Sequence, residues 1–337
     1  MADTDIYVAV PDEPGWAPIR HMAELLCSYL QVKPIVVDLA ASLDKKTKLL
    51  ATVPRLKKGE RTALVIACDP GQLNAIAQSD FILRPYRNII GWVIDSFWVD
   101  RIPRIARSLK TYDHIYVTDP ADMQDWQTAG VPSVSCLAWG ADVWGNIEER
   151  VSSTKNVDLL RVGRQPEAWD DDQQTASAAA ELGLIFSGRP AFGTSSSQAA
   201  QNLASSLKTA KCVLAFSNRV SPASYTHPRR EYVTGRWMDA LAWGCTVVGK
   251  VPATTIAEDY FWQGATLDIS PQDLKLGLKT VQNYLESWSS DQAKQHISMA
   301  LKNLDWRYRF AELANYMNWK IDRLENDLKA MKYYKIA

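Results

Sequence analysis

The chain has 337 residues, which exceeds the usual size of one domain and favours two. Lysine plus arginine equals aspartate plus glutamate, 38 of each, so the overall charge argues against nucleic acid or an acidic membrane as the partner. No stretch approaches ~18 uninterrupted apolar residues, and no signal peptide precedes the first apolar run. The five cysteines are scattered and indicate reduced thiols, so we expect a cytoplasmic protein without transmembrane segments.

Short apolar runs alternate with helical patterns along the chain, which is typical of parallel sheets with crossover helices. In the first part, an amphipathic helix carrying Ile19, Met22 and Leu26 on one face lies between the first two runs. The predicted strands are 6–10, 34–39, 63–68, 89–94, 114–117 and 133–137. The alternation restarts later, with predicted strands 157–162, 184–187, 212–216, 245–248 and 265–269.

The domain prediction follows from this alternation. We expect an N-terminal, acceptor-side domain over 1–145, a polar linker over 146–156 and a C-terminal, donor-binding domain over 157–302. An apolar stripe at three- and four-residue steps predicts one long helix over 303–337 that packs across or back onto the N-terminal domain. That stripe also leaves open a dimer formed through the C-terminal helix. A Ser-Pro-Gln-Asp sequence at 270–273 predicts another helix start, with Ser270 as its cap.

The segment 227–250 combines basic side chains, a helix start and two carboxylates. The helix is predicted to begin at Thr234-Gly235. Arginine at a helix N-terminus opposes the helix dipole, so a cluster there indicates an anion. Backbone amides and arginines bind phosphate, and carboxylates can bind sugar hydroxyls. The polar residues of the segment are His227, Arg229, Arg230, Glu231 and Asp239.

Two other patterns imitate known sites. The sequence GCTVVGK at 244–250 is close to a phosphate loop, but Val251 replaces the hydroxyl residue and the order is helix, glycine, strand. The acids at 170–172 precede an alanine-rich helix, so capping explains them better than metal binding. No G-x-G-x-x-G follows the first strand, which removes the main support for a nicotinamide enzyme.

At residues 231–248 the sequence resembles the E-x7-E signature of glycosyltransferases of the GT-B fold, in particular the family-4-like group. A strand ending in Val162-Gly163-Arg164 and the two-domain layout with a long terminal helix extend the resemblance over the whole chain. The implied fold is α/β, with two Rossmann-like domains facing each other across a cleft.

The resemblance also implies roles for individual residues. Glu231 would face the donor sugar or its phosphate, Asp239 would hold the ribose, and Arg164 would neutralise the diphosphate. Two departures stand out: Asp239 replaces a glutamate, and the lysine expected soon after Arg164 is absent, so Arg229, Arg230 or Arg236 would replace its charge. The predicted donor-binding residues are Arg164, Arg229, Arg230, Tyr232, Thr234, Gly235, Arg236 and Asp239, with the amides of Thr234, Gly235 and Arg236 on the diphosphate.

Acceptor-side residues are expected where the first sheet's strands end, because ligands of open α/β sheets gather at the carboxyl ends of strands. Asp95, in GWVIDSFW, is the preferred second catalytic residue, although an ordinary strand-end cap explains it as well. The other candidates are Asp12, Glu13, Asp69, Asp119, His21, Trp16 and Trp98, of which a surface or core role suits His21 better.

The combined prediction is a hexosyltransferase-type glycosyltransferase that needs no metal and no cofactor. Its donor would be a nucleotide diphosphate sugar, linked to UDP or GDP, and its acceptor a glycan or small molecule. The resemblance implies retention at the anomeric carbon. Two alternatives stay open: a nucleotide-sugar epimerase of the same fold, and a binding protein that has lost turnover.

Overall fold

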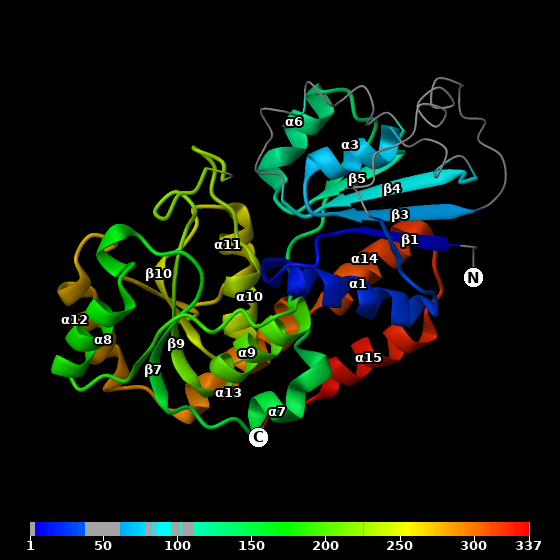
Figure 1. Ribbon diagram of the computed structural model, residues 1–337. Helices are drawn as coiled ribbons and strands as arrows, with labels where there is room; N and C mark the ends of the chain where they lie inside the picture. Colours follow the sequence, from blue (N-terminus) through cyan, green and yellow to red (C-terminus); the bar gives the residue numbers. More distant parts are fainter. Residues whose placement is uncertain are drawn as a thin grey trace. The chain divides into compact units, whose positions relative to one another are not determined.

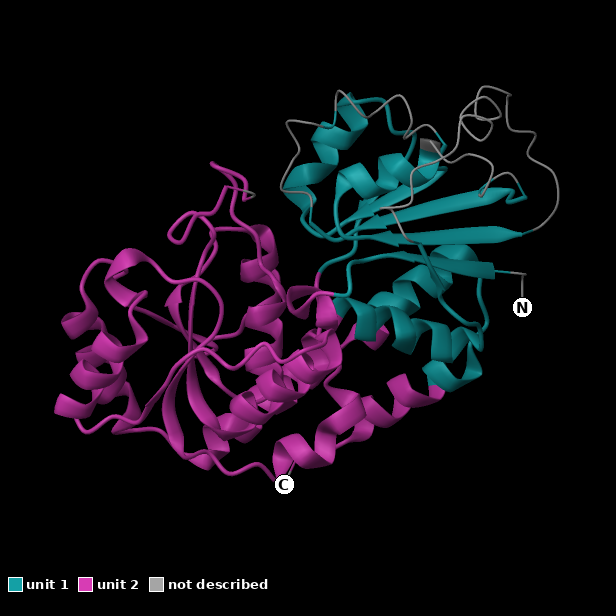
Figure 2. Cartoon of the chain, viewed as in Figure 1, with its two compact units in different colours: residues 1–12, 19–138, 309–325 teal, residues 13–18, 139–308, 326–337 magenta. Residues whose placement is uncertain are grey.

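The computed structural model describes residues 4–37, 61–78, 83, 85–95, 102, 111–224 and 226–336. The chain forms two compact units (Figure 2). Unit 1 comprises Met1–Asp12, Ile19–Ala138 and Arg309–Glu325, and unit 2 comprises Glu13–Pro18, Trp139–Tyr308 and Asn326–Ala337. Each unit has its own parallel sheet, as the alternating apolar runs predict.

Unit 1 is built on a six-stranded sheet with the order β2-β1-β3-β4-β5-β6. The register aligns Ala9, Ala67 and Val93, so β1, β3 and β4 end at the same level. Each predicted run of the first part overlaps one strand. The bounds are β1 Thr4–Ala9, β2 Ile35–Val36, β3 Thr62–Ala67, β4 Asn88–Val93, β5 His114–Val117 and β6 Val134–Cys136.

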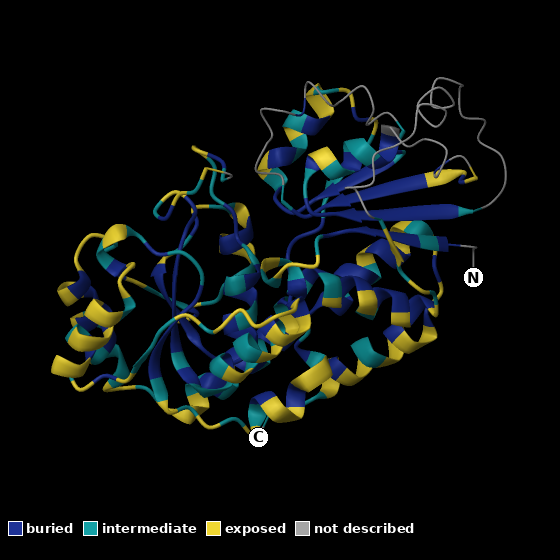
Figure 3. Cartoon of the chain, in the orientation of Figure 1, coloured by how far each residue is buried: buried dark blue, intermediate teal, exposed yellow. Residues whose placement is uncertain are grey.

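Helices cover both faces of this sheet, which is why β3 is buried along its whole length (Figures 1 and 3). The helices α3 (Pro70–Gln78) and α6 (Met123–Thr128) lie on one face, and α1 (Ala17–Leu30) and α14 (Trp306–Met317) on the other. The predicted stripe of α1 is fully buried at Ile19, Met22 and Leu26. Tyr29 of α1 meets Phe310 of α14 edge to face, with ring centroids 6.0 Å apart.

Unit 2 has a five-stranded sheet with the order β11-β10-β9-β7-β8. From β7 the chain moves to the edge strand β8 and then crosses to β9 on the other side of β7. The order therefore reverses between β7 and β9, and ligands of open α/β sheets bind outside the carboxyl ends of the strands at such a point. The strands are β7 Val157–Arg161, β8 Phe186–Ser187, β9 Ala210–Phe216, β10 Thr246–Lys250 and β11 Thr266–Asp268.

The helices of unit 2 also form two layers (Figure 1). The helices α8 (Asp172–Glu181) and α12 (Leu274–Leu285) cover one face, and α9 (Ser196–Thr209), α10 (Gly235–Ala242) and α13 (Ser290–Asn303) cover the other. The remaining helices of the chain are α7 Ile147–Val151, α11 Thr255–Tyr260 and α15 Asp322–Tyr333, with 3-10 turns at Pro14–Trp16, Pro120–Asp122, Trp144–Asn146 and Glu167–Trp169. No helix in the described ranges has the length and apolar character to cross a membrane.

Several predicted boundaries differ from the structure. The chain passes from unit 1 to unit 2 at 138–139, and the segment expected to be a linker, 146–156, contains α7. The polar composition of 146–156 suggested an exposed linker, but Arg150 of this segment is buried in unit 2. The helix expected at 270 begins at Leu274: Asp273 caps it, while Ser270 accepts from the amides of the preceding turn.

The expected long helix over 303–337 is two helices, α14 and α15, separated at Asn318, which has a φ of 53°. The apolar stripe continues across the break, so periodicity alone does not reveal it. Phe310, Leu313 and Leu324 of this stripe are buried within the chain. The stripe is therefore not exposed for a coiled coil, and a dimer through this segment is not supported.

Candidate functional site at the carboxyl edge of unit 2

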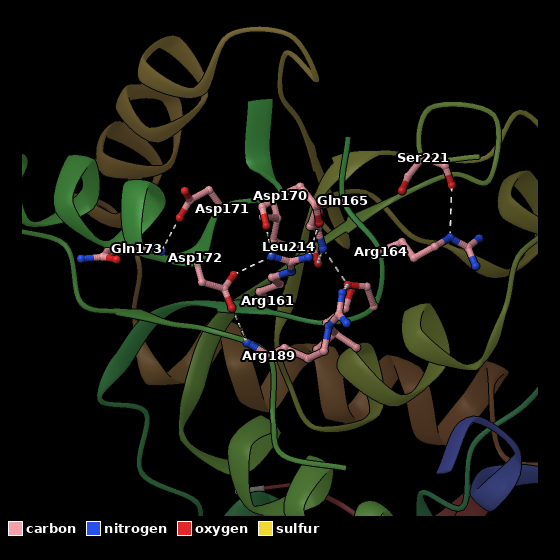
Figure 4. A network of polar contacts seen from close by, with 12 residues as sticks. Arg161, Arg164, Gln165, Asp170, Asp171, Asp172, Gln173, Arg189, Leu214 and Ser221 are labelled. Atoms are coloured by element: carbon pink, nitrogen blue, oxygen red, sulfur yellow. Dashed lines mark hydrogen bonds and ion pairs between the residues drawn. The ribbon is translucent and has the colours of Figure 1, made fainter. Parts of the chain in front are cut away.

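The strand order of unit 2 reverses between β7 and β9, and the candidate site lies at the carboxyl ends of these strands. Arg161, the last residue of β7, is still paired with Leu214 of β9. Beyond it, the buried side-chain amide of Gln165 donates to the carbonyls of Val162, at 3.2 Å, and Leu214, at 3.3 Å. Gln165 thus bridges the two strands beyond the end of β7, and Arg164 directly precedes it in the chain (Figure 4).

Two arginine side chains lie against Gly163, which follows β7, and the next residue in the chain is a third arginine, Arg164. Gly163 has a φ of +76°, and a Cβ there would lie 2.8 Å from Nη1 of Arg236, so only glycine lets this guanidinium pack against the backbone. Arg189, from the loop after β8, donates from Nη2 to the Gly163 carbonyl at 3.1 Å. Arg164 donates from Nε to the carbonyl of Ser221 at 3.4 Å. We call Arg164, Arg189 and Arg236 the arginine cluster.

The acids at 170–172 form ion pairs and hydrogen bonds with neighbouring protein groups at this edge of the sheet (Figure 4). Asp171 caps α8 through two backbone amides, as predicted. Arg161, which is 4% exposed, forms ion pairs with Asp170 at 2.5 Å and with Asp172 at 2.7 Å. Asp172 also accepts from the amide of Arg189 at 3.2 Å. Among the described residues, no group of three or more His, Cys, Asp or Glu has a metal-binding arrangement.

Glu231 is fixed at the carboxyl ends of β9 and β10. The hydroxyl of Ser217, directly after β9, donates to its Oε1, and the amide of Ala253, after β10, donates to its Oε2 at 3.0 Å. Glu231 lies before α10 and Asp239 lies on it, as the predicted helix start at Thr234-Gly235 implies. The Glu231 residue is half-buried, and its carboxylate is held by donors that follow two different strands.

The turn that carries Glu231 is organised by two buried side chains. Nδ1 of His227 accepts from the amides of Arg229, at 3.1 Å, and Arg230, at 2.9 Å. Asn218 donates to the carbonyl of Arg230 at 2.7 Å and accepts from the amide of Tyr232 at 3.0 Å. The predicted residues 229, 230 and 232 therefore shape the turn with their backbones. Tyr232 is 4% exposed, whereas Arg229 is exposed.

The helix α10 begins at Gly235 with Thr234 as its N-cap, as predicted. The Thr234 side chain makes no capping bond to the helix, and its hydroxyl instead lies 3.4 Å from Nε of Arg236. In the contacts described for this segment, the amides of Thr234 and Gly235 donate to no protein acceptor. A Cβ at Gly235 would be 3.0 Å from Cζ3 of Trp139, so glycine lets this buried ring pack against the helix start.

Asp239 lies in the second turn of α10, near a buried cation that the sequence analysis did not identify. Its Oδ2 is 3.7 Å from the position of a Cβ on Gly235, so the carboxylate points back toward the helix start. The guanidinium of Arg150 stacks over the ring of Trp243 at 4.2 Å and donates to the carbonyl of Asp142 at 3.0 Å. Burial lowers the pKa of Arg150, and the Asp239 charge is the largest opposing influence.

Asp95 belongs to unit 1, unlike the other predicted site residues. It follows β4, and its amide donates to the carbonyl of Cys68 at 2.9 Å. Burial, together with the carboxylates of Asp69 and Asp95, raises the pKa of the Cys68 thiol, which donates to Asp69 at 3.4 Å. Asp119 accepts from the amide of Ala121 at 2.9 Å and caps a 3-10 turn.

The remaining acceptor-side candidates show ordinary surroundings. Asp12 lies 3.7 Å from Nε of Arg20, His21 and Glu13 are exposed, and Trp16 is half-buried in a 3-10 turn. Trp98 lies outside the described residues.

No family model and no curated protein matches this sequence. Among solved structures, the chain is similar to α,α-trehalose 6-phosphate synthase from Burkholderia multivorans over 99% of both chains, with a TM-score of 0.54 and 9% identity. The chain has the GT-B fold. This confirms the predicted α/β architecture and the fold-level resemblance to GT-B glycosyltransferases.

Two further structures are similar over part of their length, each with a TM-score of 0.47. They are TarM, at 9% identity, and a Streptococcus pneumoniae structure of accessory secretory proteins 1, 2 and 3, at 10% identity. The similarity covers 81% and 83% of this chain, respectively. This chain spans a little more than half of each, 57% of TarM and 56% of the accessory secretory protein chain.

Sequence reasoning missed Arg161, Arg189 and Arg150. Arg189 could have been identified from the sequence, because Ser187-Gly188-Arg189 at the end of β8 repeats the strand-Gly-Arg pattern of β7. Arg161 interrupts an apolar run and needs a partner, for which the three nearby acids qualify. Arg150 gives no such sign, since Trp243 and Asp239, on which its burial depends, lie some ninety positions away.

Proposed function

We propose that this protein is a glycosyltransferase that transfers a sugar from a nucleotide diphosphate donor to a glycan or small-molecule acceptor. The observation that carries the proposal is the arginine cluster at the strand-order reversal of unit 2, beside the uncapped first turn of α10. Guanidinium groups and helix N-termini are the donors that proteins use for phosphate oxygens.

The chemistry of transfer accounts for this concentration of positive charge. When the bond between the sugar and the diphosphate breaks, negative charge develops on the departing phosphate. Arg236, which packs against Gly163, and Arg164, which is held by the Ser221 carbonyl, are both fixed before any substrate arrives and would stabilise that charge without reorganising. A metal ion is not required for this step, so we keep the prediction of a metal-independent enzyme.

Glu231 and Asp239 take the sugar-side roles in this proposal. Glu231 is fixed by Ser217 and Ala253, which support a carboxylate directed at the donor sugar. Asp239 would accept a hydrogen bond from the ribose, and its Oδ2 lies on the Gly235 side of α10. The new bond to the acceptor oxygen forms as the phosphate leaves, and the acceptor proton passes to the departing phosphate.

Other parts of the proposal come from the sequence alone. They are the choice of UDP or GDP, hexosyl transfer, retention at the anomeric carbon, a cytoplasmic location, and Asp95 as a second catalytic residue on the acceptor side.

The test is release of nucleoside diphosphate from UDP-, GDP- and ADP-sugars in the presence and absence of an acceptor mixture. Release that requires acceptor supports transfer. Interconversion of the donor without acceptor would instead identify an epimerase, and binding without product would identify a non-catalytic protein. A thermal-shift screen of the same donors selects the base first, because a ligand of the native state raises its melting temperature.

A further inference from the structure

Phe192 is a large apolar side chain that the fold leaves 57% exposed. It lies in the loop 188–195, which connects the edge strand β8 to α9. Because Ser187 of β8 pairs with Leu160 of β7, this loop starts beside the segment that carries Gly163 and Arg164. Phe192 therefore lies on the carboxyl side of the sheet, on a loop adjacent to the strand-order reversal.

The loop is held on both sides of Phe192. The side-chain amide of Asn202 donates to the carbonyl of Ala191 at 2.9 Å. Oε1 of Gln198 accepts from the amide of Thr194 at 2.9 Å and from its hydroxyl at 3.0 Å. Between them, Gly193 has a φ of +70°, and Gln198 packs on the face where a Cβ would be. The exposed ring is thus carried by a preorganised loop fixed to α9 rather than by an unanchored one.

Arg189 connects this ring to the arginine cluster. Its guanidinium carbon lies 5.9 Å from the centre of the Phe192 ring, within cation–π range. The same guanidinium donates from Nη2 to the Gly163 carbonyl, and its backbone amide is held by Asp172. One side chain therefore touches both the aromatic ring and the segment assigned to the diphosphate.

Ile185, the residue before β8, provides a comparison at the opposite end of this edge strand. Ile185 is also 57% exposed, but it lies at the amino end of β8, away from the strand-order reversal. Exposed single apolar residues of this kind need no ligand. Phe192 differs because it is planar, is fixed by an anchored loop and has a guanidinium beside it. A flat ring and a neighbouring planar donor suit an aromatic heterocycle with acceptor atoms on its edge.

We propose that Phe192 and Arg189 bind the nucleobase of the donor. The base stacks on the exposed ring of Phe192, and Arg189 donates to acceptor atoms on the edge of the base while it stays bonded to Gly163. The inference rests on the proposed function, since it names the residues that recognise the nucleoside part of the same substrate. Base stacking on an aromatic side chain tolerates every base, so Phe192 provides affinity and Arg189 provides discrimination.

The experiment measures dissociation constants by calorimetry for UDP, GDP and inorganic pyrophosphate, with the full-length protein. Phe192→Ala should raise the dissociation constant of the preferred nucleoside diphosphate by about ten-fold or more, which is the usual loss of one base–aromatic stack. Pyrophosphate binding should stay unchanged. Phe192→Trp should retain or improve nucleoside diphosphate binding. Ile185→Ala, which removes an equally exposed side chain at the other end of β8, should behave as the wild type.

The possible outcomes separate this inference from the proposed function. If Phe192→Ala binds the nucleoside diphosphate as tightly as the wild type, or loses pyrophosphate equally, the base assignment is wrong and the phosphate site stands. A wild-type protein that binds pyrophosphate but gains nothing from a nucleoside also overturns the inference alone. A wild-type protein that binds neither ligand overturns the proposed function and this inference with it.

Discussion

The two units share a strand order but differ in the charge at the carboxyl edge of their sheets. In unit 1 the order is β2-β1-β3-β4-β5-β6. In unit 2 it is β8-β7-β9-β10-β11, so in both units the second strand lies at the edge, the first beside it and the third on the other side of the first. Acids follow the strands of unit 1, at Asp69, Asp95 and Asp119. The corresponding edge of unit 2 carries the arginine cluster. The same strand order thus carries acids after the strands of unit 1 and, in unit 2, arginines beside Glu231.

This difference shows that topology provides a place and the side chains determine the ligand. Both sheets reverse their strand order beside the first strand, so both have a backbone suited to a ligand at that edge. In unit 1, Asp69 and Asp119 use their carboxylates to cap helical turns. In unit 2, Glu231 is bound by groups at the ends of two strands, and the side chains of Arg189 and Arg236 lie against Gly163. Phosphate is therefore expected on unit 2.

The largest effect is expected from Glu231→Gln, which removes the charge at the unit 2 edge and keeps a side chain able to accept from Ser217 or Ala253. Turnover should fall by about 10³-fold, as expected for the loss of a preorganised charged group. Steady-state release of nucleoside diphosphate measures this, with circular dichroism to verify the fold. Glu258→Ala, an exposed acid on α11, is the control. Wild-type turnover in the Gln variant would remove Glu231 from the site.

Arg164→Ala should weaken the binding of a nucleoside diphosphate by about ten- to hundred-fold, the usual value of one hydrogen bond to a charged group. Binding of the parent nucleoside should change little, because Arg164 is assigned to phosphate. Calorimetry with both ligands tests this, and Lys275→Ala, an exposed cation on α12, controls for net charge. An equal loss for both ligands would show that the arginine cluster does not mark the phosphate position.

Two of the buried histidines, His114 in unit 1 and His296 in unit 2, predict that the stability of the protein depends on pH. Burial lowers the pKa of His114 in unit 1 and of His296 in unit 2 to about 4, and Lys155 adds to the effect at His296. The unfolded chain binds more protons between about pH 4 and 6.5, so this stability is fully present above pH 6.5 and declines toward pH 4.

Each imidazole should contribute about 1 to 2 kcal/mol to the loss of stability between pH 7.5 and pH 5. Urea unfolding at the two pH values measures it. His114→Phe keeps a ring to pack against Tyr116 and Tyr316. It should remove the His114 contribution to the pH-dependent loss of stability and leave that of His296. A variant with an unchanged pH dependence would show that His114 titrates normally in the folded protein.

The smallest effect is expected from Asp69→Ala at the edge of unit 1. The carboxylate caps α3 through the amides of Gly71, at 2.6 Å, and Gln72, at 3.1 Å. Its loss should lower the free energy of unfolding by about 1 kcal/mol and leave nucleoside diphosphate affinity unchanged. Asp69→Asn, which preserves an N-cap, should be nearly as stable as the wild type. Weaker nucleotide binding in either variant would contradict the contrast between the two edges.

The strands could be predicted from the sequence because buried parallel strands are short apolar runs bounded by polar turns. Features set by distant contacts could not. The break at Asn318 lies within an uninterrupted apolar stripe, and the buried Arg150 contacts Trp243, which is distant in the sequence. Within the segment 227–250, the helix start at Thr234-Gly235 was predicted correctly. The roles of its backbone were not, because they depend on Asn218, which precedes the segment on another strand's end.

The most direct test of the central claim is hydrogen–deuterium exchange with and without the preferred nucleoside diphosphate. Amides at 162–165 and 231–236 should become protected, because they surround the arginine cluster and the first turn of α10. Amides at 68–72 and 119–122, at the corresponding edge of unit 1, should keep their exchange rates. Protection confined to the unit 1 edge, with none at 162–165 or 231–236, would contradict a phosphate site on unit 2.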